Sequence, residues 1–568
     1  GQPNPMQHFQ RPMQFGGYPH QAQGVLPQQR ISRRPTVPSF MSGSLRSPLQ
    51  SGRSCDFKDD DPLEELASGP VQAGVAEPDP DASQEGPLTL STRVEYSSLA
   101  RGQTQTVFGL VTVQAAEAPP SDASAASSSE NAGRQPMDIV CVLDVSGSMG
   151  QNNKIEDLKA AVRFIVDEAG PQDRLSLVAF ESSADRKLKL RRMDRQGKDE
   201  ATMETLRLRA SGGTSIAAGL DMGLAVLEQR RQRNKVSAIL LLTDGQDGST
   251  RAHLPALTKR AAQAGCGLYA FGFGADHDAE LLREISEQAR TPYTYIETTA
   301  TIREAFAGVV GGLSSIVAQR VEITLDCKVP LKQVNTPFEV RRDGECRAVV
   351  CIPDMFAGER RDVLLELAVP ADLQGSGEEG RAVLLQASAT YLDLRRGGGN
   401  RGGVAVRSAP VAMTVRRVDE LEPELEPDEE VADQRERVEV TQALEQAALC
   451  SDEGRFGEAQ QLIKERRASL ASSVAKSRRT SLTMEALGQE LEDAEHRMES
   501  SQAWRLGGAV VKDAFQMHKM QRCTNVTQSA TTQVQKSSKA MYMQSTQTAW
   551  VAKSSKSPAA SASSSSSP

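Results

Sequence analysis

Five oxygen-bearing side chains stand where a parallel α/β sheet would place a ligand. D-V-S-G-S follows an apolar strand, S-G-G-T-S precedes a helix, and T-D-G ends another strand; they contribute Asp144, Ser146, Ser148, Thr214 and Asp244. Ligand sites in open parallel sheets form just beyond the carboxyl ends of the strands. A set of carboxylate and hydroxyl oxygens, without sulfur or imidazole, suits Mg²⁺ or Mn²⁺ and disfavours zinc.

The first of these motifs has an alternative interpretation. Taken alone, D-V-S-G-S could close a tight turn and cap the helix that follows it. The presence of Thr214 and Asp244 at two other element boundaries favours metal binding instead. Because Mg²⁺ prefers six oxygens, five protein groups leave at least one position for water or an incoming carboxylate.

The elements that must position these residues alternate between strands and helices. Apolar segments predict strands at 137–144, 174–180, 235–244, 267–273 and 293–297, with amphipathic helices between them. Strands this uniformly apolar must be covered on both faces. The sequence therefore predicts an α/β domain at 137–317, with an open, mainly parallel sheet and helices on both faces.

Together, the three motifs and their element boundaries resemble the von Willebrand factor A (VWA) family with its metal-ion-dependent adhesion site. The resemblance covers 137–317, and all five ligand positions are present. It implies a Rossmann-like fold in which three hydroxyls and two aspartates hold a cation, and a partner protein's Asp or Glu completes the shell. The main prediction is therefore a non-enzymatic scaffold protein that binds partners through Mg²⁺.

The rest of the chain divides by composition and pattern. Residues 1–87 are expected to be a disordered arm and acidic linker, and the alternating strands at 88–116 are expected to pair with a β-sandwich at 320–418. A helical region is expected at 434–503. The basic, Ser- and Gln-rich tail at 504–568 is expected to be mostly disordered, with a short helix near 509–521.

Composition excludes several classes of protein. The net charge of −8 and pI near 5.6 argue against a specific nucleic-acid partner. No stretch approaches the 18 apolar residues of a transmembrane helix. Eight scattered cysteines without a C-x-x-C pair favour a reducing, cytoplasmic setting, although the chain begins with Gly and a removed signal peptide stays open.

Several weaker signals have a structural and a functional interpretation. The basic stretch at 187–198 is expected to be a solvated loop, or else to receive an acidic partner or the chain's own acidic linkers. Asp278 is expected to cap a helix beside His277, and Asp247 either supports the cation or closes a turn. Two R-R-x-S-L segments make Ser469 and Ser481 candidate targets of a basophilic kinase.

Two other functions stay open. D-G-Q-D and F-G-F-G-A-D-H-D resemble intracellular eukaryotic VWA proteins, of which some plant members are RING-type ubiquitin ligases. This chain lacks the tightly spaced Cys and His ligands of a RING, so the alternative is a substrate-receptor or regulatory part of such a ligase. A secreted adhesion or matrix protein is the third possibility, and it would need an upstream signal peptide and disulfides.

Overall fold

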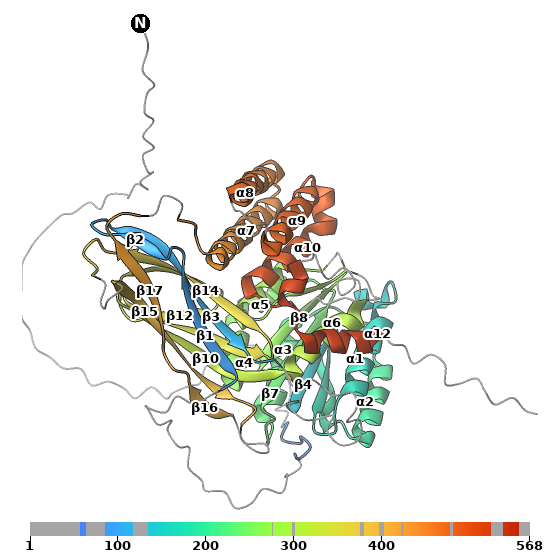
Figure 1. Cartoon of the computed structure of the whole chain (residues 1–568). Coiled ribbons are helices and arrows are strands. Elements are labelled where there is room, and N and C mark those ends of the chain that lie inside the picture. Colours follow the sequence, from blue (N-terminus) through green and yellow to red (C-terminus); the bar gives the residue numbers. More distant parts are fainter. Residues whose placement is uncertain are drawn as a thin grey trace, which may run out of the picture. The chain divides into compact units, whose positions relative to one another are not determined.

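All residues that the structure describes lie within Ser54–Pro568. In the computed structural model (Figure 1) they are residues 57–63, 86–117, 134–274, 277–297, 301–374, 380–396, 403–421, 425–476, 481–523 and 538–555. Of the disordered arm and acidic linker predicted at 1–87, residues 1–56 lie outside them. So does most of the acidic linker.

A six-stranded sheet forms the centre of the α/β domain, in the order β6-β5-β4-β7-β8-β9. Its strands are β4 (Met137–Asp144), β5 (Arg174–Phe180), β6 (Ala184–Arg192), β7 (Val236–Thr243), β8 (Gly267–Phe273) and β9 (Thr294–Ile296). Every pairing is parallel except β5 with β6. The predicted open, mainly parallel sheet is confirmed.

Strand β6 corrects the expectation of a solvated basic loop. The segment K-L-K-L-R-R alternates, and its apolar positions Leu188 and Leu190 are 5% and 1% exposed. Its basic side chains therefore project from the opposite face of an edge strand. The density of positive charge hid a period-two pattern.

Helices cover both faces of this sheet. Alternate residues of β4 point into two cores: one is shared with α1 (Lys154–Glu168), α2 (Arg195–Arg207) and α6 (Ile302–Ser314), and the other with α3 (Ile216–Gln229), α4 (Leu254–Ala264) and α5 (Ala279–Ala289). Glycines bring α3 very close to the strands. A Cβ atom at Gly219 would lie 2.7 Å from the Phe180 ring, and one at Gly223 would lie 2.8 Å from Val142.

Two sheets follow as a sandwich around a separate core, and every strand pairing in them is antiparallel except that of β17 with β2. One has the order β1-β3-β14-β11 and the other β12-β13-β10-β15-β17-β2, with β16 paired to β15. Strands β1 (Leu88–Val94), β2 (Ser98–Ala100) and β3 (Gln105–Ala115) precede the α/β domain in sequence. The strands that follow it are β10 (Ile316–Cys327), β11 (Leu331–Asn335), β12 (Glu339–Arg342), β13 (Arg347–Phe356), β14 (Arg360–Val369), β15 (Arg381–Asp393), β16 (Val404–Arg407) and β17 (Val411–Val418).

The C-terminal part contains more helix than the sequence indicated. Helices α7 (Glu429–Asp452), α8 (Phe456–Lys476) and α9 (Leu482–Arg497) are followed by α10 (Ser501–Met520) and α12 (Ser545–Ser555). The tail from 504 onward is therefore not mostly disordered across its described residues. Trp504, Val511 and Phe515 of α10 are buried, and Trp550 of α12 packs edge-on against Phe164. These few apolar contacts were hidden among polar residues.

Candidate metal centre

Four of the five predicted ligands form a hydrogen-bonded cluster at the carboxyl ends of β4 and β7. The Asp144 carboxylate accepts from the Ser146 backbone N–H at 2.8 Å, and the Ser146 and Ser148 hydroxyl oxygens lie 3.0 Å apart. The Ser148 hydroxyl donates to Asp244 at 2.8 Å. The tight turn after β4 thus brings both serines back to the sheet edge.

The fifth residue, Thr214, reaches the cluster across a glycine. A Cβ atom at Gly245 would lie 2.9 Å from the Thr214 hydroxyl oxygen and 3.2 Å from the Asp144 carboxylate. Both side chains therefore face the space that the glycine leaves open. The loop carrying Thr214 is tied to the first motif by a 3.1 Å hydrogen bond from the Gly147 N–H to the Gly212 carbonyl.

Asp247 supports this loop from behind. Its carboxylate accepts from the Ile216 backbone N–H at 2.9 Å and from the Thr250 hydroxyl at 2.5 Å, so it fixes the start of α3. Burial alone would raise the pKa of Asp247, but hydrogen bonds from Ser249 and Thr250 outweigh it and hold that pKa below its usual value. The contacts of Asp247 with Ser249 and Thr250 close the turn after β7, and support of the cation by Asp247 stays a prediction.

The charge of the cluster fits a divalent cation. Asp144 is fully buried and Asp244 is 3% exposed. Burial raises the pKa of Asp144, and the negative charge of Asp244 raises it further. Two buried carboxylates and three hydroxyls offer only hard oxygen donors, the set that Mg²⁺ prefers. Among the described residues, no group of three or more His, Cys, Asp or Glu side chains could hold a metal ion, and the present cluster has only two carboxylates beside its hydroxyls.

Lys154 is a member of this site that the sequence analysis missed. Its ammonium lies 2.6 Å from the Asp244 carboxylate and 5.7 Å from the centre of the Phe273 ring, with 8% of the side chain exposed. Two left-handed residues, Asn152 and Asn153, turn the chain so that α1 begins with this lysine. A cation at a helix N-terminus opposes the helix dipole, so a lysine there was a signal for a nearby carboxylate.

The weaker candidates have ordinary structural roles. Asp278 caps α5 by accepting from the Leu281 N–H at 2.9 Å, which confirms its predicted role. His277 hydrogen-bonds to the Tyr293 hydroxyl and the Gly274 carbonyl.

The two candidate phosphorylation sites differ in their surroundings. Ser469 is exposed on α8. Ser481 caps α9 and donates to Asp433. Modification by a kinase stays a prediction for both.

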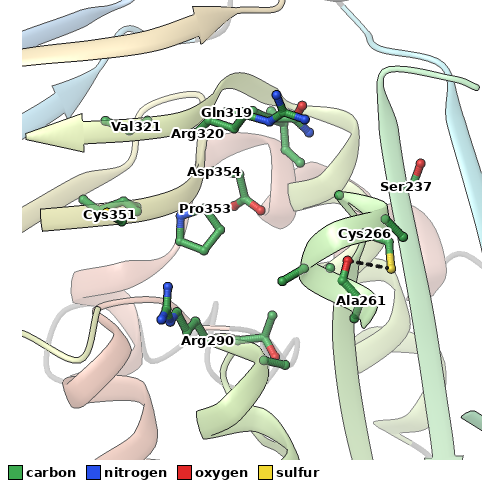
Figure 2. A pocket seen from close by; sticks show the side chains of 18 of the residues that line it. Ser237, Ala261, Cys266, Arg290, Gln319, Arg320, Val321, Cys351, Pro353 and Asp354 are labelled. Carbon is green, nitrogen blue, oxygen red and sulfur yellow. Dashed lines mark hydrogen bonds between the residues drawn. The ribbon is translucent and has the colours of Figure 1, made fainter. Parts of the chain in front are cut away.

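A separate cavity of about 1030 Å³ lies beside the sandwich (Figure 2). Gln319, Arg320 and Val321 of β10 line it, as do Ala261 and Cys266 at the end of α4. None of the five predicted cation ligands lines this cavity.

Comparison with known proteins identifies the α/β domain. Residues 138–307 match the family model of the von Willebrand factor type A domain. A von Willebrand factor type A protein from Catenulispora acidiphila has a similar fold, with a TM-score of 0.53, 18% identity, and coverage of 72% of this chain and 91% of that one.

Relatives in sequence include ligases. Residues of this chain are 31% identical to E3 ubiquitin-protein ligase WAV3 of Arabidopsis thaliana over 253 residues, which is 42% of this chain and 32% of the relative. An uncharacterized protein of Synechocystis is 26% identical over 314 residues, covering 53% of this chain and 70% of that protein. The chain spans about a third of the length of the ligases it matches.

These relatives correct one prediction. The chain was expected not to be an enzyme, because no catalytic motif was found in it. That expectation is wrong by the comparison, since WAV3 and WAVH1 are named as ubiquitin-protein ligases, which are enzymes.

Across the described residues, no helix is both long and apolar enough for a membrane crossing.

Proposed function

Because residues 138–307 form a VWA domain, we propose that this chain is the substrate-recognition part of a cytoplasmic ubiquitin ligase. In this proposal the VWA domain captures an acidic side chain of a partner protein at the carboxyl edge of its sheet. The observation that carries it is the convergence of Asp144, Ser146, Ser148, Thr214 and Asp244 at that edge. The names of the plant relatives supply the ligase context.

The five oxygens would hold Mg²⁺, and the bound ion would supply a Lewis-acidic position for the partner's carboxylate. Only two of the five groups are charged. The three hydroxyls are neutral, so they would bind the ion without cancelling any more of its positive charge. Lys154 neutralises part of the charge of Asp244, which further favours an anionic partner.

Access to this edge is compatible with protein binding. Ser148 and Thr214 are partly exposed, and the glycines beside them, Gly147 and Gly213, are exposed, whereas both aspartates are buried. A partner side chain would therefore meet the hydroxyl side of the cluster first. The proposal places ubiquitin transfer in a module outside the described residues or in a separate subunit.

The test is capture of partners from a cell extract by the full chain in Mg²⁺, followed by mass spectrometry and a ubiquitylation assay. Wild type should retain a set of proteins that a chelator releases. Asp144→Ala should fail to retain that set, whereas Asp199→Ala, which removes an exposed aspartate of α2, should behave as wild type. Equal capture in chelator would contradict the adhesion mechanism. If the captured proteins gain no more ubiquitin in extract with the chain than in extract without it, the ligase role is contradicted.

A further inference from the structure

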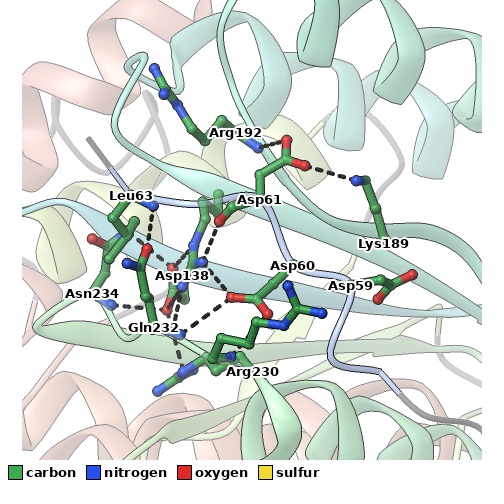
Figure 3. A network of polar contacts seen from close by, with 12 residues as sticks. Asp59, Asp60, Asp61, Leu63, Asp138, Lys189, Arg192, Arg230, Gln232 and Asn234 are labelled. Carbon is green, nitrogen blue, oxygen red and sulfur yellow. Dashed lines mark hydrogen bonds and ion pairs between the residues drawn. The ribbon is translucent and has the colours of Figure 1, made fainter. Parts of the chain in front are cut away.

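The amino edge of the same sheet carries a second, oppositely charged site (Figure 3). Residues 57–63, F-K-D-D-D-P-L, lie against β6 and the carboxyl end of α3, and we call this segment the acidic strap. Phe57, Asp60, Asp61 and Leu63 are buried, with 7–8% of each residue exposed. Lys58, Asp59 and Pro62 face solvent. Seven residues therefore present four anchors to the domain.

Asp60 enters a polar pocket built around a fully buried arginine. Its carboxylate accepts from the Arg174 guanidinium at 2.9 Å and from the Arg231 backbone N–H at 2.9 Å. The same guanidinium pairs with Asp138 at 2.8 Å and is closed off by the Gln232 carbonyl at 2.7 Å. Every side of Arg174 thus has a specific partner, and Asp60 supplies one of its two carboxylates.

Asp61 binds the free edge of the sheet. Its backbone N–H donates to the Leu190 carbonyl at 3.0 Å, as an added strand would. Its carboxylate pairs with Lys189 at 2.8 Å and Arg191 at 2.9 Å, and accepts from the Arg192 backbone N–H at 3.1 Å. The basic stretch that resembled a solvated loop therefore contacts an acidic segment of the same chain.

Apolar residues fix the two ends of the strap. Phe57 joins the core beneath α3, lies 4.4 Å from the Arg186 guanidinium, and donates its N–H to Gln229 at 2.9 Å. The Leu63 N–H donates to the Gln232 side chain. Each end of the strap thus combines an apolar side chain with a backbone hydrogen bond, which determines its register.

Removal of the strap would leave a strong charge imbalance. Five cationic side chains contact the strap or line its pocket: Arg174, Arg186, Lys189, Arg191 and Arg230. Without the strap, the ion pairs left to them would be those with Asp138 and Glu200. An uncompensated buried cation is costly, so this edge requires an acidic ligand. Most of the binding contacts are made by side chains within seven residues, as in a short recognition motif.

We propose that the amino edge of the VWA sheet is a binding site for an acidic peptide with the pattern Phe-x-x-Asp-Asp-x-Leu, and that residues 57–63 are its resident ligand. The strap binds as a separable peptide and is not an integral part of the fold. The contacts of residues 57–63 are sufficient to hold the strap on the domain without help from a covalent connection. The site is independent of the cation cluster at the opposite edge.

The experiment uses the full chain with a specific protease site placed between residues 70 and 80. After cleavage, the N-terminal piece should co-elute with the remainder in gel filtration at low salt. It should leave at 1 M salt, where the screening length falls to about 3 Å. A synthetic peptide of residues 54–66 should displace it. Separation of the wild-type piece at low salt and micromolar concentration would overturn the proposal, as would failure of the peptide to compete.

Two neighbouring aspartates give matched variants. Asp60→Asn should weaken retention of the cleaved piece at least about tenfold, because Asp60 contacts the buried arginine. Asp59→Asn removes an exposed pair with Arg186 and should change retention less than about threefold. Equal effects would contradict specific recognition. Circular dichroism of the remainder, after the strap has been removed, distinguishes a separable peptide from an integral part of the fold. A folded remainder supports the separable peptide, and an unfolded remainder overturns the proposal.

Discussion

The two edges of the VWA sheet are opposite in charge and in how that charge is satisfied. At the carboxyl edge, Asp144 and Asp244 are buried together with a single lysine. At the amino edge, a buried arginine and its basic neighbours are met by aspartates of the strap. The chain supplies the counter-charges of one edge from its own sequence. At the other edge the proposed Mg²⁺ would supply the counter-charge.

The comparison separates two uses of buried charge. Asp60 and Arg174 have their full set of hydrogen bonds within the chain, so this pair holds two segments together. Asp144 and Asp244 repel each other, and burial raises the pKa of Asp144. A buried cluster whose charges and hydrogen bonds are satisfied within the chain indicates a contact between two of its segments. A buried cluster with uncompensated charge indicates a site for an external ligand. Each prediction below changes the charge at one edge and compares the result with the other edge.

The largest effect is expected from Arg174→Met. The substitution leaves Asp60 buried without its cation and Asp138 with Arg230 alone, and loss of one partner of a buried ion pair typically costs about 3–5 kcal/mol. Thermal unfolding should show a marked fall in the midpoint, whereas Arg195→Gln, at an exposed position of α2, should leave it unchanged. An unchanged midpoint for Arg174→Met would show that the amino edge is not an essential ion-pair site.

Loss of a predicted cation ligand should be next in size. Asp144→Ala should weaken Mg²⁺ or Mn²⁺ affinity by about a hundredfold or more, since even residues behind a metal ligand contribute ten- to a hundredfold. Isothermal titration calorimetry with the metal alone measures this without a partner. Retained affinity in Asp144→Ala would place the cation elsewhere, and the strap variants should leave it unchanged.

Lys154→Met should act in the opposite direction. Removing a positive charge 2.6 Å from Asp244 should tighten Mg²⁺ binding about tenfold, because the lysine repels the ion at low effective dielectric. Lys154→Arg keeps the charge and should stay near wild type. Weaker binding in Lys154→Met would mean that the lysine positions Asp244 for the cation.

A matched pair of amide variants should differ in sign. In chelator, Asp144→Asn should raise the free energy of unfolding, because it removes repulsion between buried carboxylates. Asp60→Asn should lower it by about 1.5–3 kcal/mol, the usual size of a hydrogen bond to a charged group. Chemical denaturation of both proteins in the same buffer decides this. Equal signs would remove the contrast between the two edges.

The smallest effect concerns pH. A hydrogen bond from Arg186 holds the pKa of Asp59 below its usual value; burial would raise that of Asp61, but hydrogen bonds from Lys189 and Arg192 bring it down as well. A carboxylate whose pKa is lowered in the bound state stabilises that state at every pH above its pKa in the free state. This stabilisation is lost as the pH falls through the lowered pKa. Retention of the cleaved strap should stay constant from pH 8 to pH 5 and fall below about pH 4. Release near pH 6.5 would contradict this assignment.

The sequence predicted the carboxyl edge better than the amino edge, for a physical reason. Asp144, Ser146 and Ser148 lie within one turn, and Thr214 and Asp244 each mark the boundary of a periodic element. The partners of the strap are more than a hundred residues away, as Asp60 is from Arg174, so no local pattern joins them. Contact between the basic stretch and the chain's own acidic linker was only one of the alternatives.

Errors in the element assignment have a related cause. Strand β6 was hidden because Leu188 and Leu190 alternate with four basic residues. Helix α12 was hidden because only Trp550 and Val551 stand out as apolar anchors among its polar neighbours. In each case a few apolar side chains determine the position of the element. The polar composition of the surrounding segment conceals their periodicity.

The close packing of α3 against β4 and β5 sets a distance between the two edges. Thr214 lies just before its first residue, and Gln229 at its end holds Phe57 of the strap. Gly219 and Gly223 let the helix lie so near the strands that a Cβ atom at either position would clash with a strand side chain. With fourteen residues at a rise of 1.5 Å each, α3 is about 21 Å long, and this length separates the two edges. A bivalent partner that engaged both edges would need at least about six extended residues between its two acidic groups, and its avidity would depend on that spacing.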